Sequence, residues 1–123
     1  MTGVGSTSSP IDLRALALLA EQLDDSVVEA IVAAYLGQVA QRSLELRSAI
    51  PAGGAPLRDA AHSLAASSLT VGATRLGHLC QDIEAAVATA DDARARELAH
   101  RALPEIDEVA TGLAATRWAG SVT

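Results

Sequence analysis

A single histidine lies on the side of a predicted helix that faces solvent. At about 100° of rotation per residue, one stripe of the segment 57–71 faces a core. This stripe comprises Leu57, Ala61, Leu64 and Ser68. His62 lies about 140° from Leu57 around the same helix, so its imidazole points away from the core. An exposed imidazole is mostly neutral near pH 7, and its free ring nitrogen is then a nucleophile. His62 is therefore the candidate for chemistry.

The residues around His62 suit the approach of another protein. One turn further along, Ala65 and Ala66 are small and leave room beside the ring. On the next turn Leu69 presents an apolar side chain to solvent, which supplies contact area for docking, and Asp59 lies at the far flank. An exposed helical histidine is also often only a solvated surface residue, and the spacing by itself fits both interpretations.

Other kinds of chemistry lack the residues that they need. Nine Arg and no Lys face fifteen Asp and Glu, a net charge of −6, so the chain has no basic surface for nucleic acid or anionic membranes. One cysteine allows neither an internal disulfide nor a thiolate zinc site, and the three histidines have no i, i+4 pairing. Neither a Gly-rich phosphate loop nor a G-x-S-x-G elbow is present. We therefore expect no metal site, no cofactor and no nucleotide site.

The composition predicts an all-α protein. Of the 123 residues, 27 are Ala and 16 are Leu, both strong helix formers, and there is no Phe. The N-terminus lacks the pattern of a secretory signal, and no apolar stretch is long enough to span a membrane. We expect an up-down antiparallel four-helix bundle with a short additional N-terminal helix, monomeric and cytoplasmic.

Periodicity and turn residues predict where the helices begin and end. A short helix follows its cap Asp12, and four long helices follow it. The long helices are predicted at residues 26–50, 57–71, 73–89 and 92–117. The stretch 51–56, PAGGAP, is the clearest break. Pro104 is expected to kink or split the last helix near Leu103, because proline removes a backbone donor. Cys80 is expected on the buried side of its helix.

The chain is expected to form one domain with loose ends. The predicted parts are a flexible leader at residues 1–9, the helical bundle at 10–117 and a flexible tail at 118–123.

The residues around His62 resemble the histidine-containing phosphotransfer (HPt) domain family. The family pattern reads A-H-x-L-K-G-S-S, followed by G-A, L-x-x-L-C and a Glu. The matching positions are Ala61-His62-Ser63-Leu64, Ser67-Ser68, Gly72-Ala73, Leu76, Leu79-Cys80 and Glu84. The spacing matches without gaps, and with the flanking helices the resemblance covers about residues 11–117.

This resemblance implies a helical bundle that carries a phosphoryl group on one exposed histidine. His62 is then the acceptor, taking the group from an aspartate of a receiver domain and passing it to another receiver. The implied partners are response-regulator receiver domains or a hybrid histidine kinase, and the receiver brings the Mg²⁺. The domain itself is implied to be a carrier and not an enzyme. Its task is to present a neutral imidazole in line with the acyl phosphate.

Two positions depart from the family pattern. Ala65 stands where the family has a lysine that offsets phosphoryl charge, and Ala66 stands where the family has a glycine. Arg58 lies one turn before His62 and about 40° around the helix, so we hypothesise that it takes over part of this charge role. The alternative is that Arg58 is only solvated or pairs near Asp59.

Three interpretations follow from these residues. The first is a working phosphoryl carrier. The second is a degenerate HPt-fold module that binds receiver or kinase domains without phosphotransfer, because the lysine and glycine are missing. The third is a helical adaptor unrelated to signalling. The presence of His62 itself favours the first.

Overall fold

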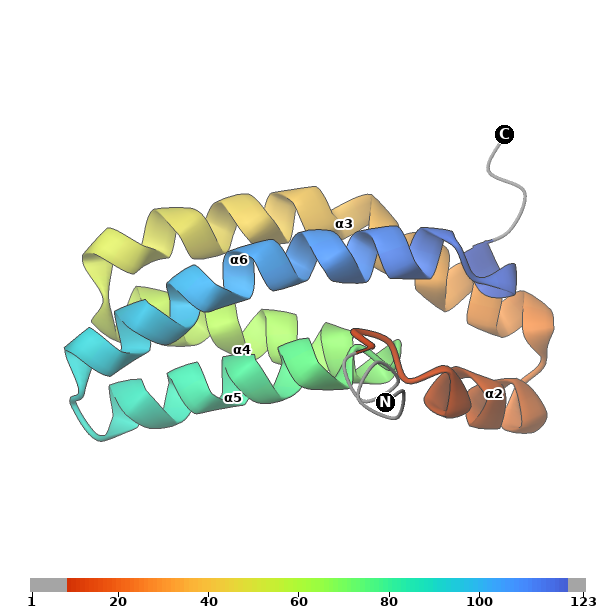
Figure 1. Ribbon diagram of the computed structural model, residues 1–123, viewed down its shortest axis with the longest axis horizontal. Helices are drawn as coiled ribbons and strands as arrows, with labels where there is room; N and C mark the ends of the chain where they lie inside the picture. Colours follow the sequence, from red (N-terminus) through yellow and green to blue (C-terminus); the bar gives the residue numbers. More distant parts are fainter. Residues whose placement is uncertain (1–8, 120–123) are drawn as a thin grey trace, which may run out of the picture.

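Between residues 9 and 119, the part of the chain that the computed structural model describes, every regular element is helical (Figure 1). The elements are α2 (Leu13–Gln22), α3 (Asp25–Ala52), α4 (Gly54–Thr70), α5 (Thr74–Ala88), α6 (Asp92–Ala114) and the short 3₁₀ helix η1 (Arg117–Ala119). The expected all-α class is confirmed for this part of the chain. The predicted flexible leader lies outside the described residues, except for Ser9.

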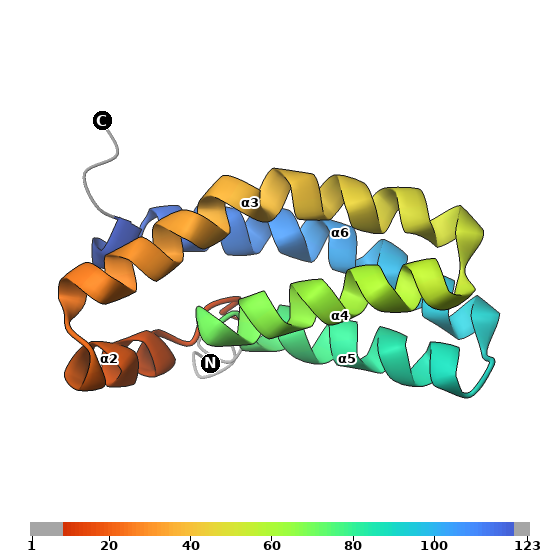
Figure 2. The ribbon, with the colours of Figure 1, turned by 180° about the vertical axis from the view of Figure 1, so that it is seen from behind.

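The long helices α3, α4, α5 and α6 lie alongside one another in both views, and short turns reverse the chain between them (Figures 1 and 2). Helix α2 lies at one end, next to the start of α3. The backbone N–H of Asp12 donates to the carbonyl of Gly72 at 2.7 Å, which ties the entry of α2 to the turn between α4 and α5. Gly72 has φ +79°, and a Cβ there would lie 2.8 Å from the Asp12 carbonyl oxygen, so only glycine suits this turn.

Aspartate side chains begin three of the helices. Asp12 accepts the backbone N–H of Arg14 at 3.0 Å at the start of α2. Asp24 accepts a hydrogen bond from the Ser26 hydroxyl and from two backbone N–H groups of the first turn of α3. These bonds, the one from the hydroxyl above all, lower the pKa of this carboxyl. Asp91 accepts the backbone N–H of Arg94 at 3.2 Å at the start of α6. Each cap pairs donors that have no partner inside the helix.

The break between α3 and α4 is shorter than the sequence predicts. Only Gly53, with φ +63°, lies outside both helices. Pro51 sits in the last turn of α3, where it removes a single backbone hydrogen bond. Pro56 falls in the first turn of α4, where its missing N–H has no partner inside the helix to lose. The expected six-residue break is therefore wrong, because Pro56 lies in a first turn that tolerates proline and Pro51 costs α3 one hydrogen bond near its end.

Pro104 does not split the last helix. Helix α6 is continuous from Asp92 to Ala114, with Pro104 on its exposed side. Buried residues occur on both sides of the proline; they are Ala95, Leu98, Ala99, Ala102, Ile106, Val109 and Leu113. Burying this apolar stripe outweighs one lost backbone hydrogen bond.

The prediction of a flexible tail from residue 118 onward is wrong for its first two residues. Trp118 is only 5% exposed and Ala119 is also buried, both in η1. The indole Nε1 of Trp118 donates to Asp25 at the start of α3, at 3.3 Å. Hydrophobic burial of the one tryptophan therefore closes this end of the bundle. Residues 120–123 of the predicted tail lie outside the described part.

One polar contact crosses the core between α3 and α4. The hydroxyl groups of Tyr35 and Ser68 lie 2.9 Å apart, and both residues are buried. Ser68 was expected on the core stripe, and its burial is confirmed. The bond satisfies both hydroxyl groups, each of which is costly to bury alone.

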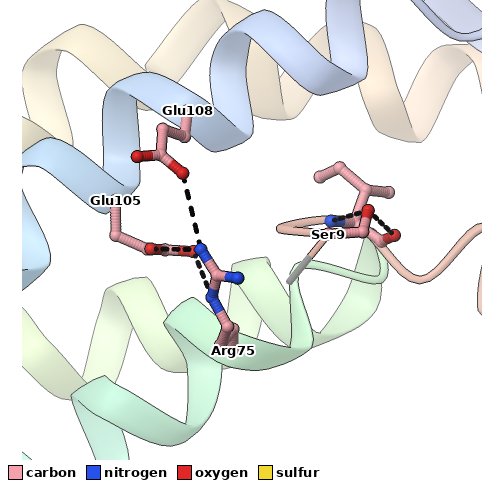
Figure 3. Close-up of polar contacts among 5 residues, drawn as sticks. Ser9, Arg75, Glu105 and Glu108 are labelled. Carbon is pink, nitrogen blue, oxygen red and sulfur yellow. Dashed lines mark hydrogen bonds and ion pairs between the residues drawn. The ribbon is translucent and has the colours of Figure 1, made fainter. Parts of the chain in front are cut away.

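Helix α5 is fastened to α6 by an ion-pair cluster. The guanidinium of Arg75 donates to Glu105 at 3.0 and 2.9 Å and to Glu108 at 3.4 Å (Figure 3). The Glu105 side chain is only 12% exposed, so this fork-shaped pair is partly desolvated. The cluster helps to fix the position of α5 against α6.

Candidate functional site

His62 projects from the middle of α4, as the sequence predicts, with 74% of its side chain exposed. Its Nδ1 lies 2.9 Å from Oε1 of Glu84 on α5. An ionised carboxylate can only accept a hydrogen bond, so Nδ1 of the neutral ring carries the proton. The lone pair then resides on Nε2. Glu84 therefore selects the ring tautomer and orients the nucleophilic nitrogen.

A shallow hollow of about 340 Å³ surrounds the imidazole between α4 and α5. Its lining residues are His62, Ala65, Ala66, Leu69, Gln81 and Glu84. The α4 side contributes small or apolar side chains, and the α5 side contributes an amide and a carboxylate. This arrangement leaves space beside the ring for a group of a few atoms.

Two of the residues expected to face solvent are placed differently. Ala65 is only 4% exposed, although it lines the hollow. Leu69 is half-buried, and its side chain packs on Gly77 of α5 so closely that an added Cβ there would overlap it. The prediction from helical periodicity missed the burial of both residues, because it assumed one core stripe and α5 covers more of α4 than that stripe. Ala66 is exposed, as expected.

A family model for the Hpt domain matches residues 30–116, which include α4, α5, α6 and most of α3. No curated protein and no solved structure matches the chain. The chain belongs to the Hpt domain family. Members of this family serve as phosphotransfer modules in phosphorelays and are carriers, not enzymes. In this Hpt domain the exposed, carboxylate-oriented His62 is the residue whose geometry suits that chemistry.

Arg58 is not among the residues that line the hollow of this Hpt domain. Its guanidinium pairs with the neighbouring Asp59 at 3.5 Å, in a contact that is largely exposed. Asp59 itself lines a separate, open groove between α3 and α4. Neither side chain has a hydrogen bond or ion pair with His62 among the described residues, and the pairing with Asp59 weighed above is the one observed.

Two residues of the site were given no role from sequence. Glu84 belongs to the quoted motif, yet only the folded arrangement shows that it reaches the His62 ring across two helices. Gln81 was not singled out. It lies three residues before Glu84, so both project from one face of α5, and this spacing is the signal that could have identified it.

The other candidate groups are inert or absent in the described part. Burial raises the pKa of the Cys80 thiol to about 12, so it remains protonated, as expected for a core residue. Between residues 9 and 119, no group of three or more His, Cys, Asp or Glu side chains could hold a metal ion. In the same range, no helix is both long and apolar enough to cross a membrane.

Proposed function

We propose that this Hpt domain accepts a phosphoryl group on Nε2 of His62 from the aspartyl phosphate of a receiver domain and passes it to another receiver. The observation that carries the proposal is the 2.9 Å contact between Nδ1 of His62 and Glu84. It leaves an exposed, unprotonated Nε2 next to open space. In phosphoryl transfer, positioning and charge stabilisation supply most of the catalysis, and a carrier needs little else.

The transfer step forms one bond and breaks one. The lone pair on Nε2 attacks phosphorus, the N–P bond forms, and the P–O bond to the aspartate breaks, leaving a carboxylate on the receiver. The Nδ1 proton stays on the ring, which becomes positively charged. The Glu84 carboxylate accepts from this N–H and stabilises the developing charge. Return of the group to a receiver aspartate reverses these changes.

The remaining expectations from sequence form part of this proposal. They are an up-down four-helix bundle of α3 to α6 with α2 as the extra helix, a monomeric state, a cytoplasmic setting, and Mg²⁺ supplied by the receiver. The proposed docking contacts are Ala65, Ala66 and Leu69, which line the hollow, together with Asp59 of the same helix. Arg58 is the proposed charge-offsetting group, which requires it to leave Asp59 when a receiver binds.

A second candidate is a binding module that docks receiver or kinase domains without phosphotransfer. The observation in its favour is that no cationic side chain lines the hollow around His62. A transferred phosphoryl group would therefore have no ion-pair partner there among the described residues.

Labelling from a radioactively phosphorylated receiver distinguishes the two candidates. We expect acid-labile label on the wild type, none on His62→Gln, and unchanged label on His78→Gln, a matched change at an exposed histidine of α5. Glu84→Ala should slow uptake about fivefold, because a charge-assisted but partly exposed hydrogen bond is worth about 1 kcal/mol. Arg58→Ala should slow uptake of the label, because Arg58 acts only while a receiver is docked. Receiver binding without any label supports the binding module, and label that persists in His62→Gln refutes the site.

A further inference from the structure

We propose that the side-chain amide of Gln81 donates the hydrogen bond that holds a phosphoryl group on His62. This inference rests on the proposed function and adds a residue to it. It concerns the group after transfer, when the phosphorus is bonded to Nε2 and its three outer oxygens occupy the hollow between α4 and α5.

The side chains that line the hollow leave one donor for those oxygens. Ala65, Ala66 and Leu69 have no polar side-chain atoms, and the carboxylate of Glu84 can only accept. The one N–H of the His62 ring is already directed at Glu84. Backbone N–H groups within α4 and α5 are used by the helices themselves. Only the amide of Gln81, with two N–H groups and no hydrogen bond to another described residue, is available.

The charges near the hollow create a need for this donor. A phosphoryl group carries close to two negative charges, and Glu84 adds another beside the same ring. The cations on the two helices are engaged elsewhere, since Arg58 pairs with Asp59 and Arg75 pairs with Glu105 and Glu108. A hydrogen bond from a neutral amide offsets part of the repulsion without a counter-charge. Oriented dipoles of this kind stabilise phosphoryl oxygens in place of an ion pair.

The position of Gln81 on α5 fits this role. It lies three residues before Glu84, a spacing that places two Cβ atoms about 5–6 Å apart on one helix face. Glu84 holds the Nδ1 side of the ring, so a neighbour one turn away on the same face can reach the group on the opposite nitrogen. Gln81 is exposed and its long side chain is free to turn toward that group.

The test measures the half-life of the phosphorylated full chain after the donor receiver has been removed. Without the receiver, the half-life reports only how well the domain holds the phosphoryl group and not how well a receiver docks. Gln81→Ala should shorten the half-life about threefold to tenfold, the effect expected from the loss of one hydrogen bond. Gln81→Glu should shorten it further, because a carboxylate replaces the donor at nearly the same size. Gln81→Lys should restore or lengthen it, because an ammonium donates and also offsets charge.

The control is Gln22→Glu at the end of α2, which makes the same change in charge at an exposed glutamine that does not line the hollow. Its half-life should equal that of the wild type, and thermal unfolding should show that all variants are folded. Equal half-lives for wild type, Gln81→Ala and Gln81→Glu overturn the inference while leaving the carrier function intact. Slower uptake with an unchanged half-life assigns Gln81 to docking and also overturns it. An unlabelled wild type refutes the proposed function instead.

Discussion

Substitution of Gly77 by alanine tests how closely α4 and α5 pack beside His62. Gly77 is buried on α5, and Leu69 of α4 lies directly over it. A Cβ at residue 77 would lie 2.5 Å from Cγ of Leu69, whereas ordinary contacts begin at 3.4 Å. The overlap involves the branch point of the side chain, so rotation of its end does not relieve it. Leu69 or the backbone of α5 must move.

The expected change in the free energy of unfolding combines two effects. Overpacking of a close contact costs about 1–3 kcal/mol. Alanine in a helix interior gains about 0.5–1 kcal/mol over glycine. Gly77→Ala should therefore destabilise the domain by roughly 0.5–2 kcal/mol. Gly37 on α3 provides the control, because a Cβ there meets no atom within 4 Å. Gly37→Ala should stabilise the domain by about 0.5–1 kcal/mol.

Urea unfolding followed by circular dichroism measures both variants on one scale. In a Leu69→Ala background the overlap is gone, so adding Gly77→Ala should become stabilising, a reversal of sign that measures the coupling directly. The same overlap displaces Leu69 at the rim of the hollow, so phosphoryl uptake from a receiver should also slow. If Gly77→Ala stabilises the wild-type chain as much as Gly37→Ala does, the close packing described here is wrong.

Two further predictions concern the buried polar groups. Tyr35→Phe and Ser68→Ala should each destabilise the domain by about 1–2 kcal/mol in urea unfolding, because each leaves one buried hydroxyl unpaired, and the double variant should cost less than the sum; strict additivity would contradict this. Cys80, whose thiol pKa burial raises to about 12, should resist alkylation until the protein unfolds. An unfolded thiol ionises near pH 8.5, so the contribution of the protonated thiol to stability should be complete below that pH and fall above it by up to about 1.4 kcal/mol per pH unit. In Cys80→Ala the free energy of unfolding should decrease less steeply above about pH 8.5. Equal slopes for the variant and the wild type would contradict the role given to the buried thiol.

Local signals in the sequence were enough to predict several features of the site. The 3.6-residue period placed His62 on the exposed side of α4 and Ser68 in the core, and both positions are as predicted. The same period placed Cys80 on the buried side of α5. These predictions depend only on which face of a helix a residue occupies. Hydrophobic periodicity determines that face before any neighbouring helix is known.

Other features depended on contacts between helices, and these the sequence predicted wrongly or not at all. Ala65 was expected to be exposed because the wheel assumes one buried stripe, but the close approach of α5 buries it. Pro104 was expected to kink or split α6; the helix is not split, because buried residues on both sides of the proline keep it continuous. Trp118 was assigned to a loose tail, yet it packs against the start of α3 from far along the chain.

The sequence by itself determined the helical class, the family and the exposed histidine, because composition, periodicity and motif spacing are local properties. Only the tertiary structure decided the chemistry around that histidine. The contact between His62 and Glu84 joins residues 22 positions apart on two different helices, and the hollow that includes Gln81 exists only where those helices meet. Helix packing determines both the contact and the hollow, because burial of the apolar faces fixes the position and rotation of α4 and α5 relative to each other.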